Sequence, residues 1–317
     1  GEFGHILLKC PRVANTENRP DLMALWLKAA QETREQGFFH MTMFHWLFPF
    51  AVELSIVHDF ELAKQILSRK SWALFQKGRA YRIAADLIGT RGLLASPDNE
   101  LWRAQRRVTS AAFKKSSLES SLLLSVRDSV DSMCLRWEES ANASGGERKP
   151  IDFAEESLSL TITVLGKFAF GSDLSHTGLH SAFECVLHRM TTFGRNPFLF
   201  ATRWLPTKGN REYWRALRTI DSVAGSTLER RAQAGIEGDD LLGQLLKASE
   251  SEKTPIDSKL ILENLKTFLF AGHDTTASAL SWAIYLLATH PIAEAQLLDE
   301  LESLGSVSPS YDQLESL

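Results

Sequence analysis

The chain has 317 residues, of which 44% are hydrophobic and 23% charged, and its formal net charge is -4. These values favour a sizeable core in one large domain, residues 1–317, and give no indication of nucleic-acid binding. The three cysteines, Cys10, Cys134 and Cys185, do not suggest a disulfide framework in a chain of this length.

The apolar periodicity predicts a mainly helical chain with a small β-sheet near the N-terminus. In chain order, the pattern predicts an amphipathic helix at residues 21–36 and two β-type runs at 38–43 and 51–57, which form a hairpin around Pro49. It then predicts another helix at residues 60–67 and an irregular stretch at residues 73–92. Further helices are predicted at residues 118–139, 152–170, 179–192 and 211–231. Cys134 and Cys185 fall within apolar helical patterns, so we expect both thiols to be buried.

The longest helical pattern begins at Asp257-Ser258, a plausible N-cap, and ends at His290-Pro291, because the residue before a proline is driven out of the α region. Roughly thirty residues at about 1.5 Å each give about 45 Å, enough to cross a domain. Charged and amide side chains, among them Glu263, Asn264 and Lys266, exclude a membrane span. The pattern therefore predicts a central helix of a large core.

Residues 270–276, Phe-Ala-Gly-His-Asp-Thr-Thr, interrupt this helical pattern. Ala271 and Gly272 remove side-chain bulk, so a flat ligand can approach the backbone. Thr275 lies one turn after Ala271, and its hydroxyl can bond back to that carbonyl and loosen the helix. Asp274 can feed protons to a molecule held there. The alternative is a kinked core helix with a solvent-facing Asp274 and with Gly272 placed for tight packing.

A second motif lies at residues 101–107, where Trp102 and Arg106 are separated by one helical turn and share a face. A guanidinium can bind a carboxylate through two parallel hydrogen bonds, and an indole N–H can donate beside it. The alternative is an amphipathic surface helix with solvated arginines.

Residues 270–276 closely resemble the oxygen-binding helix of the haem-thiolate monooxygenases, the cytochrome P450 family, which typically reads Ala/Gly-Gly-x-Asp/Glu-Thr-Thr/Ser. Every typed position matches, and His273 fills the variable one. The flanking residues 240–242 and 289–291 and the Trp-x-x-x-Arg pair also resemble the family.

The resemblance implies a cytochrome P450-type fold that binds haem b with its iron. Trp102 and Arg106 would anchor a haem propionate, and Ala271 with Gly272 would leave room above the haem. Thr275 would stabilise the oxygen species, and Asp274 would help to deliver protons.

The resemblance also implies an apolar small-molecule substrate, dioxygen, and an electron-donating reductase or ferredoxin. Because the family places a flexible substrate lid after residue 192, Phe193 and Phe198 are candidate substrate contacts, together with Phe270.

The family's iron ligand is a cysteine in a Phe-x-x-Gly-x-x-x-Cys loop near the C-terminus, preceded by a Glu-x-x-Arg helix. Neither motif is present in its place, and none of the three cysteines has the ligand context. We therefore expect a fragment, truncated before the ligand region, whose proximal cysteine lies beyond Leu317. We expect the isolated chain to be poorly folded and inactive.

Two alternatives remain. Haem-thiolate enzymes that rearrange hydroperoxides share the fold but usually lack the acid–threonine pair, so Asp274 and Thr275 argue against them. A naturally truncated, non-catalytic protein that binds a ligand or a partner is the other alternative.

The resemblance implies an intracellular protein, and any targeting peptide or membrane anchor would precede Gly1.

Overall fold

The computed structural model describes most of the chain, which divides into two compact units, Gly1–Gln76 and Lys77–Leu317. The described residues are 5–6, 22–43, 52–68, 71, 74–75, 77–78, 81–97, 99–143, 150–235, 240–250, 256–305 and 309–315. The single domain expected from the sequence stays a prediction.

The first unit contains a three-stranded sheet in the order β1-β2-β3. β1 (His5–Ile6) pairs in parallel with β2 (Phe38–Met43), and β2 pairs antiparallel with β3 (Val52–Val57). The predicted hairpin is confirmed, although Pro49 lies outside the described residues. The unit's helices are α1 (Leu22–Glu32) and α2 (Phe60–Ile66), as the periodicity predicted.

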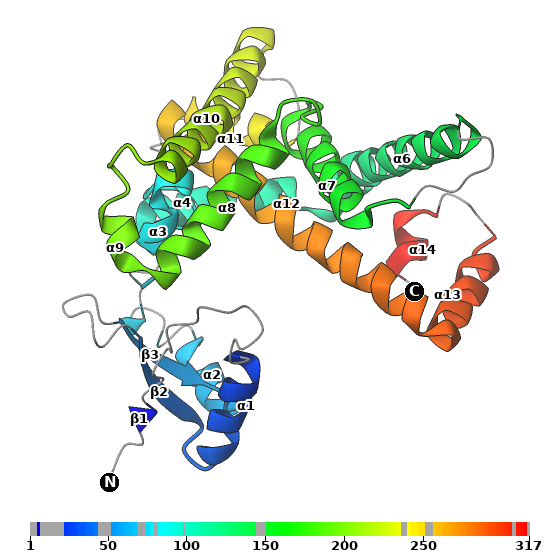
Figure 1. Ribbon diagram of the computed structural model, residues 1–317. Coiled ribbons are helices and arrows are strands. Elements are labelled where there is room, and N and C mark those ends of the chain that lie inside the picture. Colours follow the sequence, from blue (N-terminus) through cyan, green and yellow to red (C-terminus); the bar gives the residue numbers. More distant parts are fainter. Residues whose placement is uncertain are drawn as a thin grey trace. The chain divides into compact units, whose positions relative to one another are not determined.

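Helices make up the regular structure of the second unit (Figure 1), and the predicted mainly α-helical class is confirmed. Its elements are α3 (Tyr81–Ile88), α4 (Glu100–Ala112), α5 (Lys115–Ser117), the π-helical turn η4 (Leu118–Leu122), α6 (Leu123–Ala143), α7 (Phe153–Phe170), α8 (Leu179–Arg195), α9 (Pro197–Ala201), α10 (Lys208–Ala234), α11 (Leu241–Ser249), α12 (Ser258–Thr289), α13 (Pro291–Ser303) and α14 (Tyr311–Glu315).

The prediction of an irregular stretch at residues 73–92 is wrong for residues 81–88, which form α3. Leu87 and Ile88 are fully buried in the core of the unit, so tertiary packing stabilises a helix too short to persist alone. α3 ends at Gly89, whose φ of 72° suits glycine.

The long helix α12 has a buried first half and an exposed second half. Asp257 caps it by accepting the Leu260 N–H at 2.7 Å, and the helix ends before His290, as predicted. α3, α7, α10 and α11 pack against α12. In contrast, Trp282 and Tyr285 are 64% and 57% exposed, and Figure 1 shows this half running out toward α13. A search of the described helices finds none with the length and apolar composition of a membrane span.

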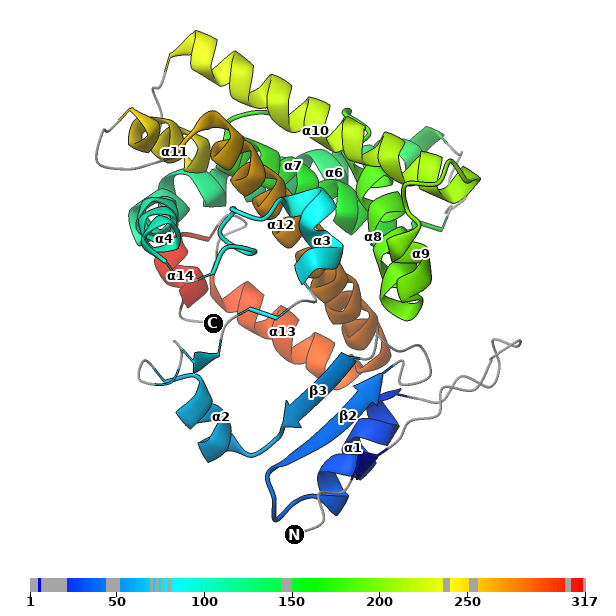
Figure 2. The same ribbon diagram turned by 90° about the vertical axis from the view of Figure 1, so that its left-hand side faces the viewer.

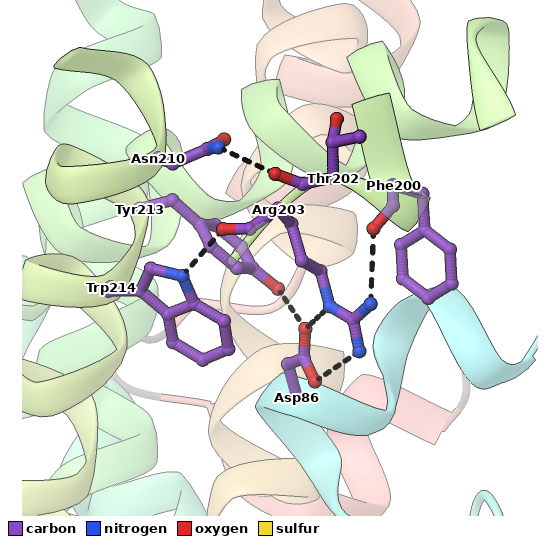
Figure 3. Close-up of polar contacts among 7 residues, drawn as sticks. All are labelled: Asp86, Phe200, Thr202, Arg203, Asn210, Tyr213 and Trp214. Carbon is purple, nitrogen blue, oxygen red and sulfur yellow. Dashed lines mark hydrogen bonds and ion pairs between the residues drawn. The ribbon is translucent and has the colours of Figure 1, made fainter. Parts of the chain in front are cut away.

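Asp86 of α3 connects this helix to the α9–α10 region (Figure 3). Its carboxylate accepts hydrogen bonds from Arg203 Nε at 2.7 Å, Arg203 Nη2 at 3.4 Å and the Tyr213 hydroxyl at 3.2 Å. The Arg203 guanidinium also lies 4.1 Å from the centroid of the Phe200 ring. Tyr213 is fully buried, and this burial, together with the Asp86 charge, raises the pKa of its hydroxyl. The cluster therefore contains a largely buried ion pair whose partners belong to segments far apart in the sequence.

We predict that Asp86→Ala lowers the free energy of unfolding by about 2 kcal/mol, because Arg203 loses its partner and the buried Tyr213 hydroxyl loses its acceptor. Urea unfolding of the protein measures the change. Glu119→Ala is the control, since Glu119 forms an exposed i,i+4 pair with Lys115, a kind of pair worth about 0.5 kcal/mol at most. An equal decrease in the free energy of unfolding in both variants would contradict the structural role of Asp86.

Candidate functional site

The motif at residues 270–276 lies at the transition from the buried to the exposed half of α12. Ala271, Thr275 and Ala279 follow one another at intervals of one turn, and all three are exposed. His273 and Ala277 are buried. The exposed row carries no side chain larger than threonine, so this part of α12 presents a narrow strip of accessible backbone.

The contact with α7 fixes how α12 is rotated about its axis. A Cβ on Gly272 would lie 3.1 Å from Leu165 Cδ2, so glycine permits close packing of the two helices. Thr161 Oγ1 donates to the His273 carbonyl at 3.0 Å, and Ser157 Oγ donates to the Ala277 carbonyl at 3.2 Å. Gly272 thus has the packing role that the sequence left open as an alternative. Its role beside a cofactor stays a prediction.

The hydrogen bond predicted for Thr275 is present. Its Oγ1 donates to the Ala271 carbonyl at 2.8 Å, on the exposed face of the helix. The predicted loosening is not seen, because residues 258–289 are α-helical throughout. The Thr275 oxygen retains lone pairs that can accept a hydrogen bond from a bound molecule.

Asp274 is exposed and borders a pocket of about 390 Å³ between α7 and α12. The pocket is lined by Ala154, Leu158, Asp274, Ala277, Ser278, Ser281, Trp282 and Tyr285. Asp274 and Thr275 are thus neighbours in sequence with accessible side chains, as an acid and a hydroxyl that exchange protons with a bound molecule must be.

The structure gives His273 a role that the sequence did not reveal. His273 packs against Phe183 of α8 with ring centroids 5.6 Å apart, and its Nε2 lies 3.4 Å from Nδ1 of His180. Its Nδ1 is buried without a hydrogen-bond partner among the described residues. Burial, and then the neighbouring His180, lower the pKa of His273 to about 4, although Asp274 opposes the shift. His273 is therefore neutral at pH 7. In the sequence, only the four-residue spacing between His273 and Ala277 could have indicated that both lie on a buried face of the helix.

Trp102 and Arg106 lie on α4, which contacts the first half of α12 through Gln105 and Asn264. The Trp102 indole N–H donates to the Leu93 carbonyl at 3.0 Å. The Lys77 ammonium donates to the same carbonyl at 2.9 Å and lies 5.8 Å from the centroid of the Trp102 ring. Arg106 is exposed one turn further along α4. Sequence reasoning missed Lys77, which lies 25 residues upstream without a motif around it.

These residues fit haem in two respects. The Lys77 ammonium, a group with several N–H donors, lies beside the Leu93 carbonyl, Arg106 is exposed one turn from Trp102, and cationic groups of this kind bind carboxylates. The strip formed by Ala271, Thr275 and Ala279 offers a surface on which a flat group can lie. The described residues supply no iron ligand at either place.

The two described cysteines lie on other helices. Cys134 is exposed on α6, so the prediction that this thiol is buried is wrong, since it falls on the outer face of that helix. Cys185 is half-buried on α8, and burial raises the pKa of its thiol. A raised pKa disfavours the thiolate that an iron ligand needs.

The predicted substrate contacts differ in their exposure. Phe193 is buried in the core, with ring centroids 5.7 Å from Phe200 and 5.3 Å from Tyr213. Phe198 is 58% exposed at the start of α9. Phe270 is half-buried on α12 and packs against the core. Their roles toward a substrate stay predictions.

We predict that His273 makes stability fall in acid. Its folded pKa of about 4 lies below the unfolded value of 6.5, so the unfolded chain binds more protons between these pH values. The contribution of the neutral His273 ring to the free energy of unfolding is fully present above pH ~6.5. About 3 kcal/mol of it is lost as the pH falls toward 4.

Urea unfolding between pH 7.5 and 4.5 should therefore show a flatter acid limb for His273→Leu than for the unmodified protein. His188→Gln is the control, because His188 is exposed on α8. An unchanged acid limb in His273→Leu would show that His273 is not held neutral by burial.

Comparison with known proteins agrees with this geometry. The family model described as Cytochrome P450 matches residues 36–317. "Cytochrome P450 709B1" of Arabidopsis thaliana is 30% identical over 251 residues, which cover 77% of this chain and 48% of that protein. "Cyclooctat-9-en-7-ol 5-monooxygenase" of Streptomyces melanosporofaciens is 28% identical over 263 residues, covering 81% of this chain and 54% of that protein. The chain thus spans about half the length of these curated relatives.

Among solved structures, the cytochrome P450DA heme domain superposes with a TM-score of 0.71 at 20% identity, covering 94% of this chain and 63% of that one. This likeness concerns the fold. The match of the family model to residues 36–317, together with the motif on α12, shows that the chain belongs to the cytochrome P450 family.

Proposed function

We propose that this chain is the oxygen-activating part of a haem-dependent monooxygenase, which inserts one atom of dioxygen into an apolar organic substrate. The observation that carries the proposal is the exposed strip on α12, where the Thr275 hydroxyl bonds to the Ala271 carbonyl beside Asp274. Family membership and the names of relatives, among them a monooxygenase and "Cytokinin hydroxylase" of Arabidopsis thaliana, support it.

Haem, when bound, supplies the activation of dioxygen, and the protein binds the haem and controls protons around it. Arg106 and Lys77 would bind the carboxylate edge of the haem beside Trp102, whose single N–H donates to the Leu93 carbonyl. Ala271 leaves space over the face of the haem. Thr275, whose O–H donates to the Ala271 carbonyl, would accept a hydrogen bond from the bound molecule at its hydroxyl oxygen, and Asp274 would help to deliver protons from solvent. Asp274 and Thr275 also disfavour the hydroperoxide-rearranging alternative.

The reaction needs two electrons, which an electron-donating reductase or ferredoxin would supply. The substrate class is an apolar small molecule, for which Phe270, Phe193 and Phe198 are the candidate contacts. The iron ligand would be a cysteine supplied beyond Leu317, because Cys134 is exposed on α6 and burial raises the pKa of the Cys185 thiol on α8. An intracellular location, with or without an N-terminal anchor, is proposed on the resemblance alone.

We predict that Thr275→Ala, in the longer protein that supplies the iron ligand, uncouples electron use from product formation. Product per electron pair should fall roughly ten-fold, because loss of a group that positions a proton transfer typically costs at least that factor. Thr275→Ser should largely restore coupling. Thr276→Ala is the matched control, since Thr276 is an exposed threonine one position away. Equal coupling in Thr275→Ala and the unmodified protein would refute the role of Thr275.

We also predict that residues 1–317 alone, expressed with haem available, are inactive and give no thiolate-haem spectrum. Without the thiolate, the electron donation that favours O–O cleavage is missing. Exposed apolar residues on α12 and α13, such as Trp282, Ile284 and Ile292, are expected to make the isolated chain aggregate. A stable monomer with a reduced carbon monoxide spectrum characteristic of thiolate ligation would overturn this prediction.

A further inference from the structure

The segment between α3 and α4 is held against α12 by its backbone N–H groups. The N–H groups of Arg91 and Gly92 donate to Glu263 Oε2 at 2.8 and 3.0 Å. The next N–H, that of Leu93, donates to Asn264 Oδ1 at 2.9 Å. Two adjacent side chains of α12 thus bind three consecutive N–H groups of an irregular segment, which Figure 2 shows beside the first half of α12.

The two binding side chains are buried. Glu263 is 6% exposed and Asn264 is fully buried. Glu263 forms no ion pair with any cation of the described residues, so peptide dipoles are what balance its charge there. Buried carboxylates are stable only when hydrogen bonds of this kind compensate them, and such bonds hold their donors in place.

The same segment is bound from its other side by α4. Asn264 Nδ2 donates to Gln105 Oε1 at 2.8 Å, and Gln105 Nε2 donates to the Arg91 carbonyl at 3.1 Å. At Gly89 the backbone runs so close to α12 that a Cβ would overlap the Glu263 carboxyl group. Residues 89–93 are therefore held at three N–H groups, at the Arg91 carbonyl and by the close approach of Gly89 to Glu263.

This conformation presents the Leu93 carbonyl to the candidate cofactor site. The carbonyl accepts hydrogen bonds from the Trp102 indole at 3.0 Å and from the Lys77 ammonium at 2.9 Å. It thereby sets where the indole and the ammonium lie relative to α4 and Arg106.

We propose that Glu263 and Asn264 are positioning residues of the cofactor site. By holding the N–H groups of residues 91–93, they fix the Leu93 carbonyl and, through it, Trp102 and Lys77. This inference rests on the proposed haem-binding function, because it assigns the Lys77 ammonium to the haem carboxylates while the single indole N–H of Trp102 stays on the Leu93 carbonyl. Neither Glu263 nor Asn264 touches the cofactor in this proposal.

The test uses the longer, haem-loaded protein and three variants. Glu263→Leu removes the acceptor of the Arg91 and Gly92 N–H groups, and Glu263→Gln keeps an acceptor oxygen but loses the charge. Lys266→Met is the matched control, because Lys266 is a buried charged side chain on the same helix that pairs instead with Asp221 of α10 at 2.7 Å. Hydrogen exchange of residues 89–96 reports the segment, and haem transfer to excess apomyoglobin reports cofactor release.

We expect exchange at residues 91–93 and the rate of haem release each to rise about ten-fold in Glu263→Leu, with smaller rises in Glu263→Gln. Lys266→Met should leave both unchanged. If Glu263→Leu does not fold, faster haem release in Glu263→Gln than in Lys266→Met supports the proposal, and equal release overturns it.

The outcomes separate the inference from the function on which it rests. An unmodified protein that binds no haem contradicts the proposed function and this inference with it. An unmodified protein that binds haem, with equal release in the Glu263 variants and in Lys266→Met, overturns the positioning role alone. Faster exchange without faster haem release would show that the network is purely structural, and would also overturn it.

Discussion

The close contact between α7 and α12 determines what the rest of the second unit can do. Gly272 lets Leu165 approach the α12 backbone, and the hydroxyls of Thr161 and Ser157 donate to α12 carbonyls one turn apart. With His273 and Ala277 thereby buried against α7 and α8, the 3.6-residue turn places Ala271, Thr275 and Ala279 on an accessible face. The residues proposed to exchange protons owe their exposure to a packing contact on another face of the same helix.

The first half of α12 organises a second set of contacts through side chains that a core helix seldom carries. Glu263 and Asn264 bind the segment after α3, and Lys266 pairs with Asp221 on α10. Buried polar groups of this kind stabilise a structure only when their partners are all in place. One helix therefore joins the candidate carboxylate-binding residues on α4, the α10 region and the Thr275 strip. A disturbance of the Glu263 or Asn264 contacts should affect the carboxylate-binding end of the proposed haem site, whereas the Lys266 pair belongs to the contact with α10.

The features predictable from the sequence are those that depend on local chemistry. Asp257 and Pro291 mark the ends of α12, and the Thr275 bond to the Ala271 carbonyl follows from a spacing of one turn. The family resemblance gave the fold class and the motif residues. What could not be predicted depends on partners far along the chain. α3 is stabilised because its Leu87 and Ile88 are buried in a core whose other residues lie far along the chain. The buried ring of His273 contacts His180 on another helix, and the Trp102 indole donates to a carbonyl whose position we assign to Glu263. No local pattern encodes such pairings.

We propose that these residues form the oxygen-activating part of a haem-thiolate monooxygenase whose iron ligand follows later in the coding sequence. Sequencing the transcript past the codon for Leu317 tests this proposal. We expect a continuing frame that encodes a Glu-x-x-Arg helix and then a Phe-x-x-Gly-x-x-x-Cys loop, which would identify the ligand. A stop codon immediately after Leu317 would contradict it, because no thiolate-haem centre could then form, and a non-catalytic binding role would replace the proposed enzyme.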